Sequence, residues 1–134
     1  MKVLDSYALL AWLGDERPAS ETVQQLLDRA ESGELELAMS RINWGEVFYI
    51  VAKKHGRKTA RKIRHRLEKL PVAFVSATDD RVAAASELKA TCAFAYADAF
   101  AAGLALEHDA ELVTGDPEFR PLENHEDLHL LWLD

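Results

Sequence analysis

The sequence has a single cysteine, few prolines and glycines, and no long apolar run. Its 134 residues include one cysteine, four prolines and six glycines. The lone Cys92 excludes a disulfide within the chain, and its place in the run T-C-A-F-A predicts a small buried side chain. The opening M-K-V-L-D-S is neither a signal peptide nor a membrane span, because Asp5 interrupts a short apolar stretch. We therefore expect a cytoplasmic protein with no membrane partner.

Basic residues are scarce outside one segment. The chain has 23 acidic and 16 basic residues and a formal net charge of -7, which taken alone argues against a polyanionic partner. Residues 53–69, however, hold nine of the sixteen Lys and Arg residues and one acid, Glu68. This asymmetry marks the segment as a candidate contact for a polyanion, with a solvated helix face as the alternative.

Short apolar strands alternate with helical patterns along the chain. Strands are expected at residues 2–4, 35–39, 72–75, 111–114 and 128–133. Helices are expected at residues 7–13, 18–30, 41–54, 58–70, 79–90 and 97–107. The alternation, without repeats or linkers, predicts one α/β domain over residues 1–134 with a mainly parallel central sheet. In such sheets ligands bind beyond the carboxyl ends of the strands.

Four acidic residues have surroundings unlike a solvated surface. Asp5 directly follows the first strand, and Asp116 follows the strand E-L-V-T with only Gly115 between them. Asp98 lies in the first turn of an alanine-rich helix, and Glu46 lies in the middle of an apolar one. The three aspartates have an alternative role as helix caps or first-turn acids, whereas Glu46 has no local partner. Because four such carboxylates would repel one another without a cation, the pattern favours a divalent metal site.

Carboxylate ligands indicate which metal ion, and therefore which reaction, the site would support. Carboxylates without a neighbouring histidine or cysteine favour Mg²⁺ or Mn²⁺ over zinc, and such ions serve phosphodiester cleavage. A haloacid dehalogenase-type phosphatase would need a second acid two residues after Asp5, where Tyr7 stands. A nucleotide-binding Rossmann domain would need a glycine-rich turn there. We interpret Glu118 as an exposed first-turn acid, with a place at the edge of the site as the alternative.

Four segments together resemble the PIN domain. They are V-L-D-S-Y-A-L-L-A-W-L, S-R-I-N-W-G-E-V, Y-A-D-A-F-A-A-G-L-A and L-V-T-G-D-P-E-F, in this order. Within that family the chain is similar to single-domain ribonuclease toxins of bacterial and archaeal toxin-antitoxin pairs, the VapC type. The resemblance implies a three-layer α/β/α sandwich. The family's acidic quartet maps onto Asp5, Glu46, Asp98 and Asp116.

The resemblance also implies an activity. It is that of an Mg²⁺- or Mn²⁺-dependent endoribonuclease toxin, which hydrolyses phosphodiester bonds in structured RNA such as transfer or ribosomal RNA with metal-activated water. The quartet would be both catalytic and metal-binding, with Asp5 and Asp116 as the direct ligands. A cognate antitoxin and a second copy of the chain in a homodimer are the implied protein partners.

Three further residues would support the quartet. The family uses a hydroxyl beside the first aspartate and another near the last, and Ser6 and Thr114 occupy these positions. Thr114 and Asp116 are two residues apart and would share a face if the strand continues. Asn43 precedes Glu46 by one helical turn and would lie beside it.

The basic segment and the apolar helix before it remain to be assigned. With RNA as substrate, we expect Arg57, Lys58, Arg61 and Lys62 to contact its phosphates, which gives affinity without sequence choice. The surplus of apolar residues at 41–54 suggests a partner surface. Two alternatives stay open: an RNA-binding or regulatory PIN-fold module without turnover, and a PIN nuclease not paired with an antitoxin.

Overall fold

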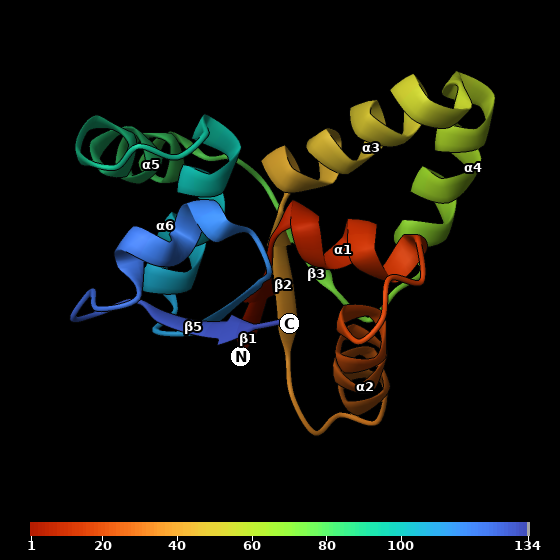
Figure 1. The fold of residues 1–134 in the computed structure, drawn as a ribbon, viewed down its shortest axis with the longest axis horizontal. Coiled ribbons are helices and arrows are strands. Elements are labelled where there is room, and N and C mark those ends of the chain that lie inside the picture. The colour runs from red at the N-terminus through yellow and green to blue at the C-terminus, as the bar shows by residue number, and fades with distance from the viewer. Residues whose placement is uncertain (134) are drawn as a thin grey trace.

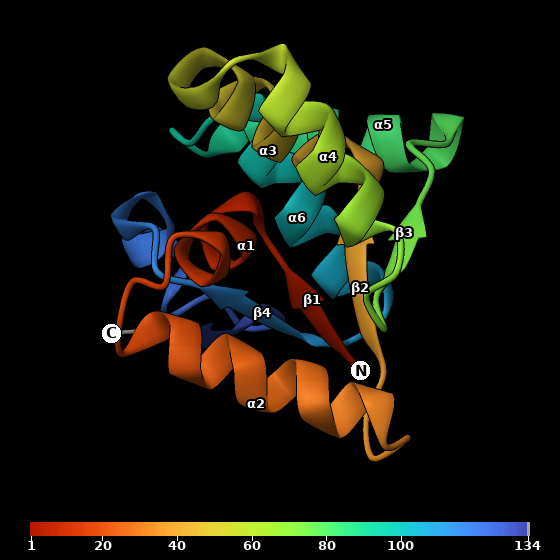
Figure 2. The same cartoon turned by 90° about the vertical axis from the view of Figure 1, so that its right-hand side faces the viewer.

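A computed structural model of the chain describes residues 1–133 and contains one central sheet (Figures 1 and 2). Its strands are β1 (Lys2–Leu4), β2 (Leu37–Ser40), β3 (Ala73–Val75), β4 (Glu111–Thr114) and β5 (His129–Trp132). They pair in parallel in the order β3-β2-β1-β4-β5. The predicted α/β class with a mainly parallel sheet is therefore confirmed.

Helices connect the strands. They are α1 (Ser6–Leu13), α2 (Ala19–Glu31), α3 (Arg41–His55), α4 (Arg57–Leu67), α5 (Asp79–Thr91), α6 (Tyr96–Glu107) and the short 3-10 helix η1 (Pro117–Leu122). Ser40 caps α3 and Thr78 caps α5 through their hydroxyl groups, as their positions in the sequence predict. None of the helices within residues 1–133 is long and apolar enough to cross a membrane.

Two local predictions were wrong. Helix α4 ends at Leu67 rather than Leu70, because Pro71 disfavours helical geometry at the residue before it. Cys92 is only half-buried, because it lies directly after the last residue of α5. The alternative role of Asp116 as a helix cap and the interpretation of Glu118 as a first-turn acid are confirmed, and the helix that they begin is the short 3-10 helix η1.

Two cores lie on opposite faces of the sheet. Consecutive strand residues point to opposite faces, so Leu4 and Val113 pack with α1 to α4, whereas Val3 and Leu112 pack with α5, α6 and η1. Figure 1 shows α5 and α6 to the left of β2, with β5 below α6, and α1 to α4 to the right of β2. The predicted three-layer sandwich is confirmed.

The order of the strands places a topological switch point beside β1. Strands β2 and β3 lie on one side of β1, and β4 and β5 lie on the other. At such a switch point the connections leave neighbouring strands toward opposite faces of the sheet, and in α/β sheets ligands bind beyond the carboxyl ends of these strands. Leu4 pairs with Val113 at the ends of β1 and β4, so the residues that follow these strands lie at the same edge of the sheet.

Candidate functional site

Asp5 stands at the carboxyl end of β1 and is only 1% exposed. Its Oδ1 accepts a hydrogen bond from the backbone N–H of Ala8 at 2.9 Å, which caps α1, and its Oδ2 accepts one from the hydroxyl of Thr114. Burial is the main cause that raises the pKa of Asp5 to about 7, although these two hydrogen bonds lower it. The charges of Asp116 and Glu46 raise the pKa as well. Asp5 therefore caps a helix and also lies within electrostatic reach of the other acids.

Asp98 enters the site from the first turn of α6 and is 7% exposed. Burial is the main cause that raises its pKa to about 8, followed by a hydrogen bond with Glu118. The charges of Asp116, Asp5 and Glu46 raise it further. The other three acids of the predicted quartet therefore lie within electrostatic reach of Asp98.

Asp116 and Glu118 come from η1, immediately after β4. Asp116 caps this helix by accepting a hydrogen bond from the backbone N–H of Glu118 at 2.9 Å, with Pro117 at the first helical position. The turn directs Glu118 back toward α6, where its Oε2 accepts from the backbone N–H of Ala95 at 3.4 Å. Carboxylate oxygens of Asp98, Asp116 and Glu118 lie within 4.8 Å of one another.

Glu118 is therefore a site residue that the sequence-based interpretation set aside. Its side chain is exposed, as predicted, yet its carboxylate joins the cluster. The signal for its position was the pair Asp116 and Pro117, which predicts a tight turn that would bring the residue two places after Asp116 back toward the same end of the sheet.

Glu46 reaches the site from the second turn of α3 and is half-buried. Its Oε2 accepts a hydrogen bond from the hydroxyl of Tyr49 at 3.3 Å. Its charge contributes to the raised pKa values of both Asp5 and Asp98, although it is not among the three carboxylates within 4.8 Å of one another. It borders the cluster from the α3 side.

Thr114 joins two of the acids. It is fully buried, its hydroxyl donates to Asp5, and the same oxygen accepts the backbone N–H of Asp116 at 3.0 Å. A single side chain thus fixes the carboxylate after β1 relative to the turn after β4.

Ser6 and Asn43 join three helices. Both are buried; the Asn43 side-chain amide donates to the Ser6 hydroxyl at 3.3 Å and to the backbone carbonyl oxygen of Ala97 at 3.1 Å, and the Ser6 hydroxyl donates to the backbone carbonyl oxygen of Asn43 at 3.3 Å. The side chain predicted to lie beside Glu46 is thus turned toward α1 and α6. These bonds hold together α3 and α6, which carry Glu46 and Asp98, and α1, which begins directly after Asp5.

The donor set fits a hard divalent cation. Three carboxylates converge within 4.8 Å, and the charges of Asp5 and Glu46 act on this group; burial first and charge repulsion second raise the pKa values of Asp5 and Asp98. A cation would remove that repulsion, and oxygen ligands of this kind suit Mg²⁺ or Mn²⁺. Asp98, Asp116 and Glu118 would hold it, with Asp5 and Glu46 bordering them.

Unfolding of the metal-free protein should become easier as the pH rises. Asp5 and Asp98 have folded pKa values of about 7 and about 8, above the ordinary 3.8. Between the pKa of these groups in the unfolded chain and their pKa values in the folded chain, the folded chain binds more protons than the unfolded chain does. The stability that the protonated forms add is therefore fully present below the unfolded pKa and is lost as the pH rises through the folded pKa values. The midpoint of thermal unfolding, measured between about pH 5 and pH 8.5, should therefore fall as the pH rises.

Added Mg²⁺ or Mn²⁺ should offset most of the loss at the higher pH, since a bound cation replaces the protons. The Asp98→Asn variant should show a shallower decline without metal. A metal-free midpoint that rises with pH over the same range would contradict the raised pKa values.

The predicted RNA-binding residues lie apart from the acids. Arg57, Lys58, Arg61 and Lys62 are exposed on α4, and none of them forms an ion pair within residues 1–133. Figure 1 shows α4 folded back against α3 at the outer right, away from α6 and η1. The cations therefore form a separate surface that α3 connects to the acidic site.

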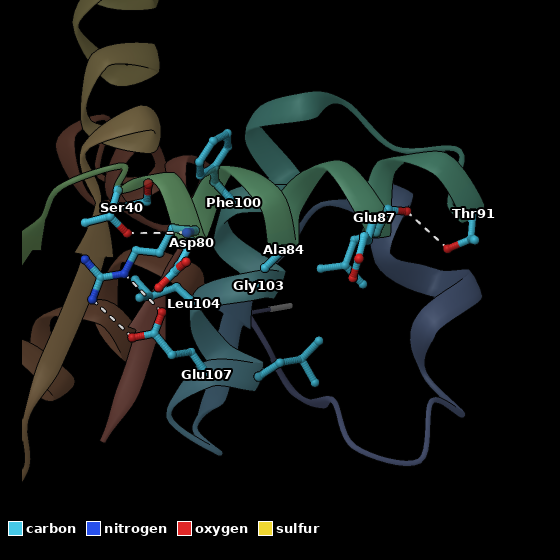
Figure 3. A pocket seen from close by; sticks show the side chains of 13 residues that line it. Ser40, Asp80, Ala84, Glu87, Thr91, Phe100, Gly103, Leu104 and Glu107 are labelled. Carbon is cyan, nitrogen blue, oxygen red and sulfur yellow. Dashed lines mark hydrogen bonds and ion pairs between the residues drawn. The ribbon is translucent and has the colours of Figure 1, made fainter.

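A cavity of about 860 Å³ lies elsewhere, between α5 and α6 (Figure 3). Phe100, Thr78 and Glu87 are among the residues that line it. An ion pair from Arg81 Nε to Glu107 Oε1 at 3.0 Å stands at its edge and lowers the pKa of Glu107. None of the five site carboxylates lines this cavity, so it is distinct from the acidic cluster.

The sheet and the cluster at its switch point define an α/β domain with a carboxylate site suited to a hard divalent cation. The family model of the PIN domain matches residues 2–124. The chain therefore belongs to the PIN-domain family, which confirms the resemblance seen in its four motifs.

Solved structures share the fold over nearly the whole chain. A VapBC2 complex from Rickettsia felis, bound to a promoter DNA fragment, has a TM-score of 0.72 at 16% identity and covers 99% of this chain and 98% of its own. DNA-bound VapBC from Salmonella typhimurium has a TM-score of 0.70 at 16% identity, with 99% and 98% covered. VapC20 from Mycobacterium tuberculosis, a sarcin-ricin loop cleaving toxin, has a TM-score of 0.69 at 16% identity, and the match covers 92% of this chain and 95% of that toxin. Among curated proteins, none matches the sequence.

Proposed function

We propose that this PIN domain is a metal-dependent endoribonuclease toxin of a toxin-antitoxin pair, acting in the cytoplasm on structured RNA such as transfer or ribosomal RNA. The observation that carries the proposal is the convergence of Asp98, Asp116 and Glu118 within 4.8 Å, with Asp5 and Glu46 raising the charge around them. Family membership supports it, as does the similarity in fold to a toxin described as cleaving the sarcin-ricin loop.

The chain's own residues would prepare the site for phosphodiester hydrolysis. Mg²⁺ or Mn²⁺ held by the carboxylates would supply an activated water and stabilise negative charge on the phosphate. Thr114 keeps the Asp5 carboxylate in place through its hydroxyl. The hydrogen bond between Asp98 and Glu118 holds a proton that must leave before both groups can act as ligands. No side chain serves as a covalent nucleophile in this scheme.

Protein partners follow from the same comparison and from the α3 surface. Structural neighbours include a toxin-antitoxin complex from Klebsiella pneumoniae and FitAcB from Neisseria gonorrhoeae. Trp44, Phe48 and Ile50 on α3 are only half-buried, as is Trp12 on α1. These apolar side chains would receive a cognate antitoxin or the second copy of a homodimer.

Cleavage of RNA by the purified protein tests the proposed activity. Total RNA should be cut in Mg²⁺ or Mn²⁺ and left intact with a chelator, and the Asp5→Asn and Asp98→Asn variants should fail to cut it. Equal cutting by the wild type and both variants would reveal a contaminant and sink the assignment. A wild type that binds RNA but does not cut it in either metal would support the non-catalytic alternative instead.

The exposed cations of α4 should contribute affinity without changing the chemistry. Replacing Arg57, Lys58, Arg61 and Lys62 by glutamine should weaken RNA binding. It should also reduce the slope of log K against log salt by up to about 3, since each lost phosphate contact removes about 0.7. Lys89→Gln on α5, an exposed cation outside this helix, is the control. If the quadruple variant keeps the wild-type slope, α4 is a solvated face.

A further inference from the structure

Exposed aromatic rings border the acidic cluster. Five large apolar or aromatic residues of the described chain are exposed, and three of them are Tyr7, Tyr49 and Tyr96. Each of these tyrosines is two or three residues away in sequence from an acid of the quartet. Their contacts differ, and the contacts show which rings face the site.

Tyr7 lies against the turn that carries Asp116. A Cβ atom placed on Gly115 would stand only 2.2 Å from Cε1 and 2.6 Å from Cζ of the Tyr7 ring, so the ring rests directly on the backbone of Gly115. A side chain at Gly115 would displace the ring. Tyr7 remains 39% exposed, which leaves part of the ring open to solvent beside the acids.

Tyr49 lies on α3 and contacts Glu46. Its hydroxyl donates to Glu46 Oε2 at 3.3 Å, it is 49% exposed, and the Lys53 ammonium lies 5.7 Å from its ring centroid. Glu46, Tyr49 and Lys53 are spaced at i, i+3 and i+7, so they share one face of the helix. An acid, an aromatic ring and a cation therefore follow one another from the site toward α4.

Tyr96 faces away from the cluster. Its ring packs edge-on against Phe100, with centroids 5.1 Å apart, and its hydroxyl lies 3.3 Å from that of Ser86 on α5. Because residues two apart on a helix do not face each other, Tyr96 and Asp98 point in different directions. Tyr96 is 45% exposed, much as Tyr7 and Tyr49 are, but it lies outside the site and therefore serves as a control for them.

We infer that Tyr7, beside the turn of Asp116, and Tyr49, beside Glu46, stack RNA bases next to the acidic site; this rests on the proposed ribonuclease function. An exposed ring next to a phosphate-cleaving site offers a π-face to a base, and a cation beside the ring adds a phosphate contact. Bases of an RNA duplex are stacked on each other and cannot reach such rings, whereas bases in loops can.

Binding by Tyr→Leu and Tyr→Phe variants tests this role. In an Asp98→Asn background with Mg²⁺, we would measure the Kd of a labelled single-stranded oligouridine and of an oligomer of equal length without bases. Tyr7→Leu and Tyr49→Leu should each weaken oligouridine binding about 5- to 150-fold, and the phenylalanine variants should stay within about twofold. Binding of the abasic oligomer and the salt slope should not change. Tyr96→Leu should bind as the background does.

Two results would overturn the inference. One is wild-type-like oligouridine binding by both leucine variants, which would assign the rings to a protein partner or to solvent. The other is an equal loss for the abasic oligomer, which would mean that the rings support the fold or the phosphates rather than the bases. Cleavage by the unsubstituted protein reports separately on the proposed function, and a protein that binds no RNA at all would refute both.

Discussion

Replacing Asp98 by asparagine should reduce metal-dependent RNA cleavage by roughly 10²- to 10³-fold and at the same time stabilise the metal-free protein. Activity falls because one of three carboxylates within 4.8 Å of one another is lost. Stability rises because the folded state no longer opposes ionisation of a group whose pKa is raised to about 8. An asparagine amide still donates to Glu118, so the local contact is kept.

Two measurements on the same samples check this result. Initial rates of RNA cleavage in Mn²⁺ give the loss of activity, and thermal unfolding with a chelator near pH 8 should give a midpoint several degrees higher than the wild type. Asp79→Asn, which removes an exposed first-turn acid of α5, is the control and should leave the cleavage rate unchanged. An Asp98→Asn protein that cuts RNA normally, or that is less stable without metal, would show that Asp98 is a structural residue.

Truncation of Phe119 to alanine should cost about 3–5 kcal/mol of unfolding free energy and also impair the site. Phe119 is fully buried and meets the ring of Phe94 edge-on, with centroids 5.7 Å apart. It lies in η1, directly after Glu118, and it anchors this short helix to the core beneath α6. Loss of the ring would free the segment that holds Asp116 and Glu118 in position.

Chemical unfolding and metal titration separate the two effects. The midpoint should fall in Phe119→Ala, and stabilisation by Mn²⁺ should be weaker than in the wild type at the same concentration. Phe119→Leu, which keeps most of the buried volume, should lose less stability and retain the response to Mn²⁺. If Phe119→Ala is destabilised but responds fully to the metal, the position of η1 does not depend on this anchor.

Most of the fold follows from local sequence patterns. Alternation of short apolar strands with helices determines the class, and Gly56, Ser40 and Thr78 mark helix ends that the structure confirms. The quartet was recognisable because each acid interrupts an apolar element. Asp5 and Asp116 also follow strands that are neighbours in the sheet.

Long-range packing determines what the sequence could not indicate. Glu118 approaches Asp98 across twenty residues of sequence, only because η1 turns back and Phe119 packs under α6. The Asn43 amide bonds to Ser6 and Ala97 rather than pointing along its own helix, since three helices converge there. Such contacts depend on how whole elements dock, which no pattern within one element encodes.

The acids of the site are far apart in sequence, because Asp5 borders a cluster whose last member is Glu118. During synthesis, a ribosome must therefore translate at least as far as Glu118 before the last acid can reach the first. A nascent chain that stops between these residues holds only scattered carboxylates. The proposed activity would thus arise only after this whole span is translated and folded, and a shorter nascent chain would not cleave the RNA of the ribosome that makes it.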